Sequence, residues 1–164
     1  MLRTLYFTYV QSTIDYCLPV WGKAAPTTID PVVRTHKKFL KLLLNIHPYE
    51  HGYVYENLAN EASIFPLNNR CLYLYASILF NHIQSNVLNE NYYLIPKANR
   101  YSTRNSSRFQ IPYVKLSSTL RSPRIKLLHV INNYSDLDIF GNSKKVFLST
   151  LKIDLNSYYS NPIS

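Results

Sequence analysis

The stretch that decides the fold is TIDPVVRTHKKFLKLLLNI, residues 28–46. Its apolar residues recur at three- and four-residue steps, which predicts an amphipathic helix with one buried stripe. We expect Thr27 or Thr28 to cap its start, Pro31 to be tolerated in its first turn, and His47-Pro48 to end it. The stripe consists of Ile29, Val32, Val33, His36, Leu40, Leu43 and Leu44, and the opposite side carries Arg34, Lys37, Lys38 and Lys41.

The same spacing predicts further helices on both sides of this one, at residues 2–17, 54–62, 67–84 and 144–155. Residues 67–84 are apolar almost all round, which is typical of a central helix. Residues 85–107 are rich in Asn, Ser and Arg and indicate a long loop, and β-favouring runs within 108–114 and 124–131 predict a small hairpin. The expected fold is mainly α, a bundle of about four to five helices with a small β-hairpin after a long basic loop. Residues 1–86 are expected to form the helical bundle, and residues 87–164 the basic loop, the hairpin and a last helix packed on it.

The seven-residue stretch from Tyr16 to Gly22 lies where the first helix is expected to end. It holds the only tryptophan and one of only three glycines. We expect Pro19 to stop the first helix and Gly22 to let the chain turn. Tyr16 and Trp21 would then pack at the corner and fix the angle between two helices. The alternative is that Trp21 stacks directly on nucleic acid.

Charge is segregated along the chain, which has 164 residues, a formal net charge of +9 and a pI of about 9.5. Such a balance favours polyanionic partners, with nucleic acid first and an anionic membrane surface second. Residues 97–126 contain eight basic residues and no acidic one, interleaved with Tyr101, Phe109 and Tyr113. Cations neutralise phosphates and rings stack on unpaired bases. The candidate nucleic-acid-binding residues are Arg34, Lys37, Lys38, Lys41, Arg100, Arg104 and Arg108; the alternatives are a solvated helix face and a basic loop that docks on its own domain.

Catalytic and metal-binding patterns are weak. The HPYEH run at residues 47–51 fits the H-x-x-E-H pattern of one metalloprotease class, but Pro48 and Gly52 favour a turn over the continuous helix that such a site needs. Asp136 and Asp138 are better explained as loop or capping carboxylates than as cation ligands. The sequence shows no nucleophile elbow, no phosphate-binding glycine loop and no adjacent aspartates. We therefore expect no catalytic residue, metal or cofactor in this chain.

The compartment is expected to be intracellular, in the cytoplasm or the nucleus. Cys17 and Cys71 form no CxxC pair and no disulfide framework. The longest near-continuous apolar run, 71–80, is about half of what a membrane span needs. We therefore expect no membrane partner.

The order of these motifs resembles the C-terminal region of reverse transcriptases from non-LTR (LINE-like, jockey-type) retrotransposons. That family has a helix reading L-R-x-L-Y-x5-S-x3-Y-x4-W-G, which this chain matches from Leu2 to Gly22. A basic helix of the form L-x3-Q-K-R-x2-R-x-I follows at residues 32–46, and a P-L stretch precedes the next long helix at Pro66-Leu67. The H-x-Y-x-T-R motif appears as residues 100–104, and the closing S-x3-F-K-x2-L-K helix as residues 143–152.

The chain departs from the family pattern in three places. Cys17 stands where the family usually has Gly, and His36-Lys37-Lys38 replaces Q-K-R. Residues 129–133 lack the tryptophan that the family has before its last helix. These departures suggest a diverged or decaying copy.

The resemblance implies that this segment is the thumb, and the region beyond it, of an RNA-directed DNA polymerase. The metal-binding aspartates of such an enzyme belong to its palm, so the chain is not expected to polymerise by itself. Its partners would be an RNA–DNA hybrid or other nucleic acid and the missing fingers and palm of the same polyprotein. The alternatives are a helical protein-interaction module and a non-functional retrotransposon relic.

Overall fold

The computed structural model describes the chain except for residues 23, 85–108, 114, 134–142 and 161–164. The chain divides into two compact units, Met1–Cys71 (unit 1) and Leu72–Asn161 (unit 2). The division falls inside one helix, α6 (Leu67–Gln84). The domain boundary predicted between residues 86 and 87 lies outside the described residues.

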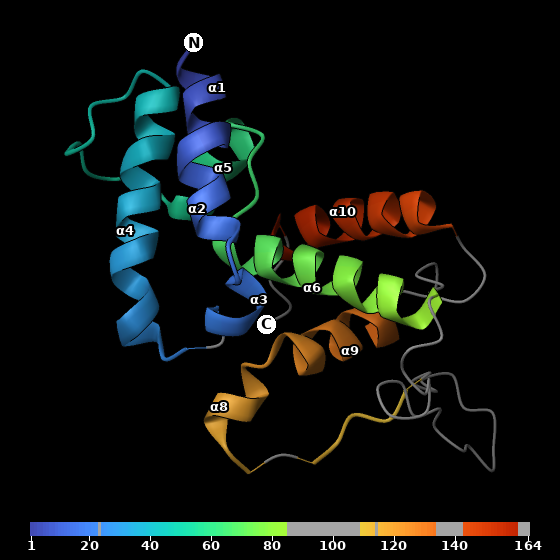
Figure 1. Ribbon diagram of the computed structural model, residues 1–164. Helices are drawn as coiled ribbons and strands as arrows, with labels where there is room; N and C mark the ends of the chain where they lie inside the picture. The colour runs from blue at the N-terminus through green and yellow to red at the C-terminus, as the bar shows by residue number, and fades with distance from the viewer. Residues whose placement is uncertain (23, 85–108, 114, 134–142, 161–164) are drawn as a thin grey trace. The chain divides into compact units, whose positions relative to one another are not determined.

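Unit 1 begins with a continuous helical stretch made of α1 (Leu2–Leu5), the π-helix η1 (Tyr6–Gln11) and α2 (Ser12–Asp15). A short helix, α3 (Leu18–Trp21), leads to α4 (Pro26–Leu43), α5 (Tyr55–Glu61) and the start of α6. Figure 1 shows the N-terminal stretch running alongside α4. The helices predicted at residues 54–62 and 67–84 are therefore present, and the mainly helical fold is confirmed.

The start of α4 differs from the prediction. Ala25 is its N-cap residue, without a side-chain cap, and Pro26 occupies the first turn. Thr27 and Thr28 thus lie inside the helix, because a proline in the first turn fixes a helical φ and has no N–H to satisfy. Pro31 also lies inside the helix rather than in the first turn.

Two helices of unit 1 end in the same way without a glycine. After α4, Asn45 has a φ of 58°, and the N–H of Ile46 donates to the carbonyl of Lys41 at 2.8 Å. After α5, Ser63 has a φ of 55°, and the N–H of Ile64 donates to the carbonyl of Ala59 at 2.8 Å. These are Schellman ends, which satisfy the last carbonyls of a helix. Both turn the chain sharply back onto the unit.

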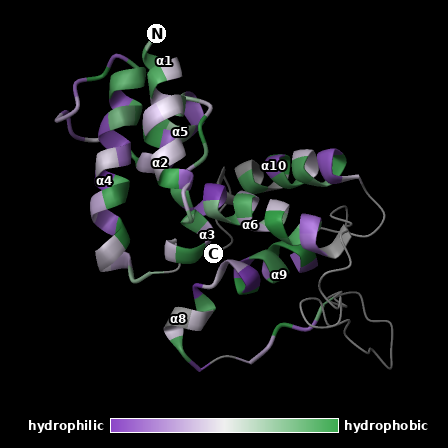
Figure 2. Cartoon of the chain, in the orientation of Figure 1, coloured by the Kyte–Doolittle hydropathy of each residue, from purple (hydrophilic) through white to green (hydrophobic). Residues whose placement is uncertain are grey.

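The core of unit 1 lies between the N-terminal helical stretch, α4 and α5. Figure 2 shows hydrophobic residues on α4 and on its neighbours in the same unit. The buried apolar residues that pack together are Tyr6, Leu40, Leu58, Ala59, Ala62 and Ile64. The core fixes which side of α4 faces outward.

Unit 2 contains the second part of α6, α8 (Ser117–Leu120), α9 (Pro123–Asn133) and α10 (Lys144–Ser160). Its core is made by α6, α9 and α10, with the rings of Phe80 and Phe147 stacked at 5.6 Å between centroids. The predicted last helix is present, and the N–H of Val146 faces the Ser143 hydroxyl at 3.5 Å, as expected for a cap. Val146 itself is exposed.

The predicted β-hairpin is wrong for the described residues. Residues 124–131 belong to α9, whose Ile125, Leu128 and Ile131 are buried at helical spacing. The Asn132 side chain pairs with the backbone of Phe109. The Phe109 N–H donates to Asn132 Oδ1 at 2.9 Å, and Asn132 Nδ2 donates to the Phe109 carbonyl at 2.9 Å. One amide side chain thus satisfies both backbone groups of a residue buried in the unit 2 core.

Candidate nucleic-acid interface

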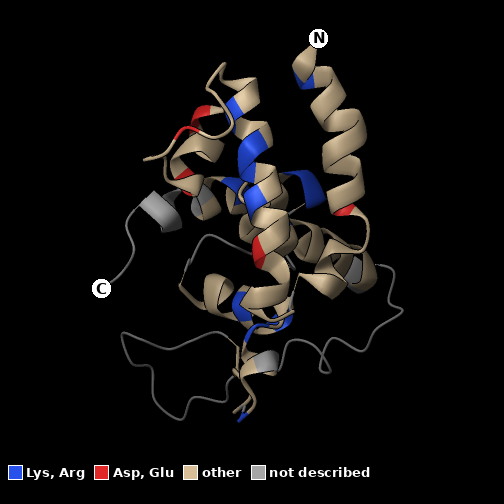
Figure 3. Ribbon diagram, turned by 90° about the vertical axis from the view of Figure 1, so that its left-hand side faces the viewer, with Lys and Arg blue, Asp and Glu red and all other residues tan. Residues whose placement is uncertain are grey.

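The outer side of α4 carries the basic residues that the sequence predicts as a binding face. Figure 3 looks onto α4 and shows its basic positions along the helix. Arg34 and Lys38 are exposed and lie four residues apart, so they are neighbours on one face. His36 and Leu40 are buried beneath them. Because the core holds the inner side of the helix, these two cations stay directed to solvent.

The placement of Lys41 on the exposed basic face is wrong. Its side chain is only 5% exposed, and its ammonium donates to the carbonyls of Pro48, at 3.1 Å, and Glu50. After the Schellman end of α4, residues 46–53 fold back along the helix and bring these carbonyls to Lys41. A buried charge of this kind needs several acceptors, and the two carbonyls supply them. Lys41 therefore holds the turn after α4.

Lys37 and Lys38 are also engaged with the returning segment. The half-buried Lys37 donates from its ammonium to the carbonyl of Tyr53. The Lys38 ammonium lies 4.8 Å from the centre of the exposed Tyr49 ring, which is within cation–π distance. The exposed cationic surface of α4 therefore reduces to Arg34 and Lys38, with the Tyr49 ring beside Lys38.

A buried polar network lies under this surface. The Tyr6 hydroxyl is 2.5 Å from His36 Nε2, the Tyr55 hydroxyl is 2.7 Å from His36 Nδ1, and the Leu67 N–H donates to the Tyr55 hydroxyl at 3.0 Å. Burial lowers the pKa of His36 to about 4, against an opposing effect of Asp15, and raises the pKa values of Tyr6 and Tyr55. A neutral imidazole has one donor and one acceptor nitrogen, so it can join two hydroxyls. The network fixes α4 against the N-terminal stretch through Tyr6 and against the start of α5 through Tyr55.

Asp15 and Arg70 form an ion pair that the sequence analysis missed. Arg70 Nη2 lies 2.7 Å from Asp15 Oδ2, and Arg70 Nε lies 3.0 Å from Asp15 Oδ1. The two-point geometry gives direction as well as attraction. The ion pair joins the end of α2 to the start of α6 across 55 residues. No local sequence pattern predicts a pair this far apart.

The corner between Tyr16 and Gly22 is structural, but most of its residues act differently from the prediction. Tyr16 is 78% exposed, so its ring does not pack there; its carbonyl accepts the Trp21 indole N–H at 2.8 Å. Pro19 does not stop the first helix, which ends at Asp15; it lies in the first turn of α3. The residue that turns the chain is Cys17, with a φ of 52°. Trp21 closes the corner by bonding backbone five residues earlier.

Gly22 is needed for a close approach rather than for a turn. Its φ of −64° is open to any residue. A Cβ atom at this position would lie 2.7 Å from the Leu18 carbonyl oxygen and 3.0 Å from Cys71 Sγ. Glycine therefore allows α3 to pack closely on the start of α6.

Replacing Cys17 by Gly is expected to stabilise unit 1. A non-glycine residue in the left-handed region is strained, and relief of that strain, offset by the entropy of glycine, leaves a gain of about 0.5–1 kcal/mol. Urea unfolding followed by fluorescence of Trp21, the only tryptophan, measures it. Cys17→Ala keeps the strain and is the control, which we expect to lie within about 0.5 kcal/mol of the parent chain. A Cys17→Gly variant no more stable than Cys17→Ala would contradict this explanation of the corner.

Several predicted residues fall outside the described part of the chain. Arg100, Arg104 and Arg108 lie within residues 85–108, and Asp136 and Asp138 lie within residues 134–142. Residues 47–51 form a turn and not a helix, as predicted. Among the described residues, no group of His, Cys, Asp and Glu side chains is arranged to hold a metal ion.

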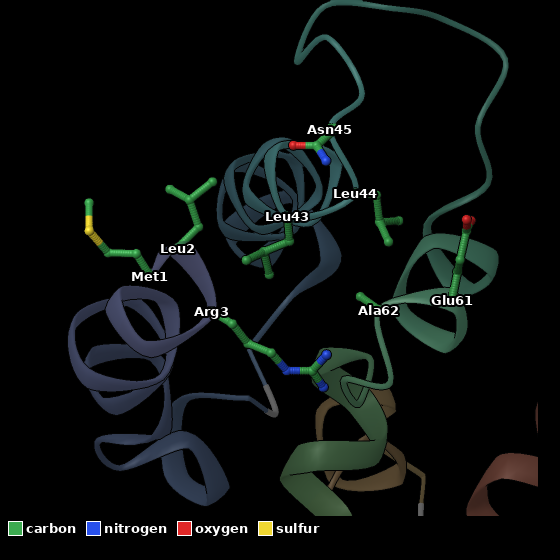
Figure 4. Close-up of a pocket in the computed structure, with 8 residues that line it drawn as sticks. All are labelled: Met1, Leu2, Arg3, Leu43, Leu44, Asn45, Glu61 and Ala62. Carbon is green, nitrogen blue, oxygen red and sulfur yellow. The ribbon is translucent and has the colours of Figure 1, made fainter.

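A cavity of about 470 Å³ opens at the end of α4. Figure 4 shows Arg3 reaching between the helices and Glu61 on the α5 side. Leu43 and Leu44 supply apolar walls. With one basic and one acidic residue, this cavity lacks the uniform positive charge of the α4 surface and is a poor phosphate site.

Comparisons with known proteins found no match: no family model, no curated protein and no solved structure is similar to this chain. Within the described residues, the helices are too short or too polar to cross a bilayer.

Proposed function

We propose that the chain is a thumb-like region of a non-LTR retrotransposon reverse transcriptase that grips primer–template nucleic acid through phosphate contacts. The observation that carries the proposal is the outer face of α4. Arg34 and Lys38 stand exposed one turn apart, and no acidic residue occurs between Arg34 and Lys41. A rigid helix with cations at helical spacing can follow a sugar–phosphate backbone without reading bases.

The corner geometry supports the resemblance on which the proposal rests. The family pattern has Gly at the position of Cys17, and Cys17 adopts a φ of 52°, a conformation that glycine takes without strain. The pattern also ends in W-G. Here Trp21 bonds the Tyr16 carbonyl, and Gly22 has no room for a side chain. Three positions of the family motif therefore each have a separate structural role in this corner: a left-handed φ at Cys17, a backbone hydrogen bond from Trp21 and a close approach at Gly22.

In this role, the buried network positions the binding face. His36 is fixed by Tyr6 and Tyr55, so the exposed side of α4 is held at a set rotation. The Tyr49 ring beside Lys38 restricts the lysine side chain and lowers the entropy lost on binding. The chain would hold duplex in register, and the chemistry of polymerisation would belong to the palm of the parent enzyme.

Hybrid binding across a salt series tests the proposal. We expect the Arg34→Glu/Lys38→Glu variant to lose at least about tenfold in affinity for an RNA–DNA hybrid at 0.1 M salt. The slope of log K against log salt should fall by about 0.9 for each lost contact. The matched control Arg34→Lys/Lys38→Arg keeps both charges and should keep the slope. A parent chain with a flat salt response, or a reversed variant that binds as the parent does, would contradict the proposal.

One observation favours the second candidate, a protein-interaction module. A groove of about 390 Å³ on unit 1 is lined largely by apolar side chains of the N-terminal stretch and α4, among them the exposed Leu5, Tyr9 and Leu42. Exposed apolar grooves mark sites of protein contact. Tyr9→Glu/Leu42→Glu should abolish capture of a protein partner while leaving hybrid binding intact, whereas the α4 charge variants should do the reverse.

A further inference from the structure

A second basic surface lies on unit 2 and was not among the predicted sites. A shallow cavity of about 510 Å³ is lined by Tyr73 of α6 and by one face of α10. The lining residues from α10 are Lys144, Lys145, Leu148, Ser149 and Lys152. Of the described residues around this cavity, half are lysines and none is acidic.

Helical spacing explains why the lysines gather. Lys144, Leu148 and Lys152 follow each other at four-residue steps, so they share one face. The rise of 1.5 Å per residue places Lys144 and Lys152 about 12 Å apart along the helix axis. Lys145 and Lys152 are exposed, and Lys144 is half-buried. The surface is long enough to meet more than one phosphate of an extended strand.

The core of unit 2 holds this face outward. Phe147, Leu151 and Leu155 are almost fully buried on the other side of α10. Phe147 also stacks on Phe80 of α6. Rotation of α10 about its axis would expose these side chains, so the lysines keep their direction.

The positions of Lys144 and Lys145 do not serve the helix itself. Both lie in its first turn, which contains no acidic residue. The N-terminal end of a helix carries a partial positive charge, and lysines placed there destabilise the helix. An anion bound at this surface would offset that repulsion.

Tyr73 adds an aromatic ring to the cations. It is half-buried, packs against the unit 2 core and also lines the cavity. Lysines beside an accessible ring are the combination by which proteins hold unpaired nucleic-acid strands: the cations follow the backbone and the ring stacks on a base. A duplex keeps its bases stacked inside the helix and would use the lysines but not the ring.

We propose that the cavity between Tyr73 and the lysine face of α10 binds a single-stranded segment of nucleic acid. This inference rests on the proposed function in one respect, because both treat the chain as a nucleic-acid-binding protein. The two surfaces differ in ligand: α4 takes the duplex backbone, and α10 takes the unpaired strand.

Fluorescence anisotropy with a labelled 20-nucleotide single strand tests the inference on the full chain. We expect Lys144→Glu/Lys145→Glu to reduce single-strand affinity at least about tenfold at 0.1 M salt, with the salt slope smaller by about 0.7 for each lost contact. Glutamates in the first turn favour the helix, so the melting temperature should stay the same or rise. A loss of binding therefore cannot be assigned to unfolding. Tyr73→Leu, which keeps apolar volume toward the core, should cost about five- to tenfold.

The matched control is Lys115→Glu/Lys126→Glu, which makes the same change in net charge elsewhere in unit 2. An equal loss in this control, unchanged binding in the α10 variant, or no single-strand binding by the parent chain would each overturn the inference. The hybrid assay separates the two proposals. Loss of hybrid binding in the α4 variant with intact single-strand binding in the α10 variant rejects only the α10 site; the opposite pattern rejects only the α4 face.

Discussion

Acidification from pH 7 to pH 4 is expected to lower the free energy of unfolding of unit 1 by about 3 kcal/mol through His36 alone. Burial lowers the pKa of His36 from 6.5 to about 4 in the folded chain. Below pH 6.5 His36 binds a proton in the unfolded chain but stays neutral in the folded chain, so folding becomes less favourable. The loss of stability begins near pH 6.5 and is nearly complete near pH 4. Its size follows from the pKa difference, at about 1.4 kcal/mol for each pKa unit.

The position of His36 explains the direction of this shift. The hydroxyl oxygens of Tyr6 and Tyr55 can accept from a protonated imidazole, so the two hydrogen bonds do not prevent protonation. The cost of protonation is the burial of a positive charge beside an apolar core. This cost opposes protonation while the unit stays folded.

Urea unfolding at a series of pH values, followed by Trp21 fluorescence, measures this loss. His36→Gln is the control, because its amide can still donate and accept but does not titrate between pH 4 and 7. The parent chain should lose about 3 kcal/mol more than His36→Gln over this range. Equal losses in the two chains would show that His36 is accessible or already charged.

Gly22→Ala is expected to cost about 2–3 kcal/mol of stability. The added Cβ would lie 2.7 Å from the Leu18 carbonyl oxygen and 3.0 Å from Cys71 Sγ, closer than ordinary contacts. The nearer atom belongs to the backbone of α3, so α3 itself must shift, and overpacking of this kind destabilises a core.

Gly52→Ala provides the comparison. Gly52 has a φ of 92° with nothing within 4 Å of its added Cβ, so it suffers backbone strain of about 1 kcal/mol but no clash. Removing the sulfur with Cys71→Ala should restore only part of the loss in Gly22→Ala, because the Leu18 carbonyl remains. A Gly22→Ala chain as stable as Gly52→Ala would mean that α3 can move away at little cost.

The sequence predicts helices better where their signals are local. The helix predicted at residues 67–84 has the same first and last residues in the structure, because its apolar run is long and Pro66 precedes it. The strand predicted within residues 124–131 is wrong, because Ile125, Lys126 and Leu127 alternate apolar and polar residues as a short strand does. Pro123, in the first turn of a helix, and the burial of Leu128 and Ile131 at helical spacing decide otherwise.

The candidate surface is predictable in outline but not in its members. Helical periodicity places Lys41 away from the apolar stripe, as it does Arg34. Only the return of residues 46–53 along α4 buries it, and that path depends on the left-handed Asn45. The pairs Tyr6–His36 and Asp15–Arg70 span 30 and 55 residues, so no window of sequence contains them. The spacing of Lys144 and Lys152 in the sequence is enough to place them on one face of a helix. The sequence does not show that Tyr73 of α6 lies beside that face.

The pairing of Asn132 with Phe109 has a consequence for the stability of unit 2. The Asn132 amide accepts from the N–H and donates to the carbonyl of Phe109, so one side chain takes the role of a peptide group at a buried residue. Asn132→Ala would remove both hydrogen bonds at once, and the loss of partners at buried backbone groups costs about 1–3 kcal/mol. A polar residue at the end of α9 is therefore as important to this core as an apolar one.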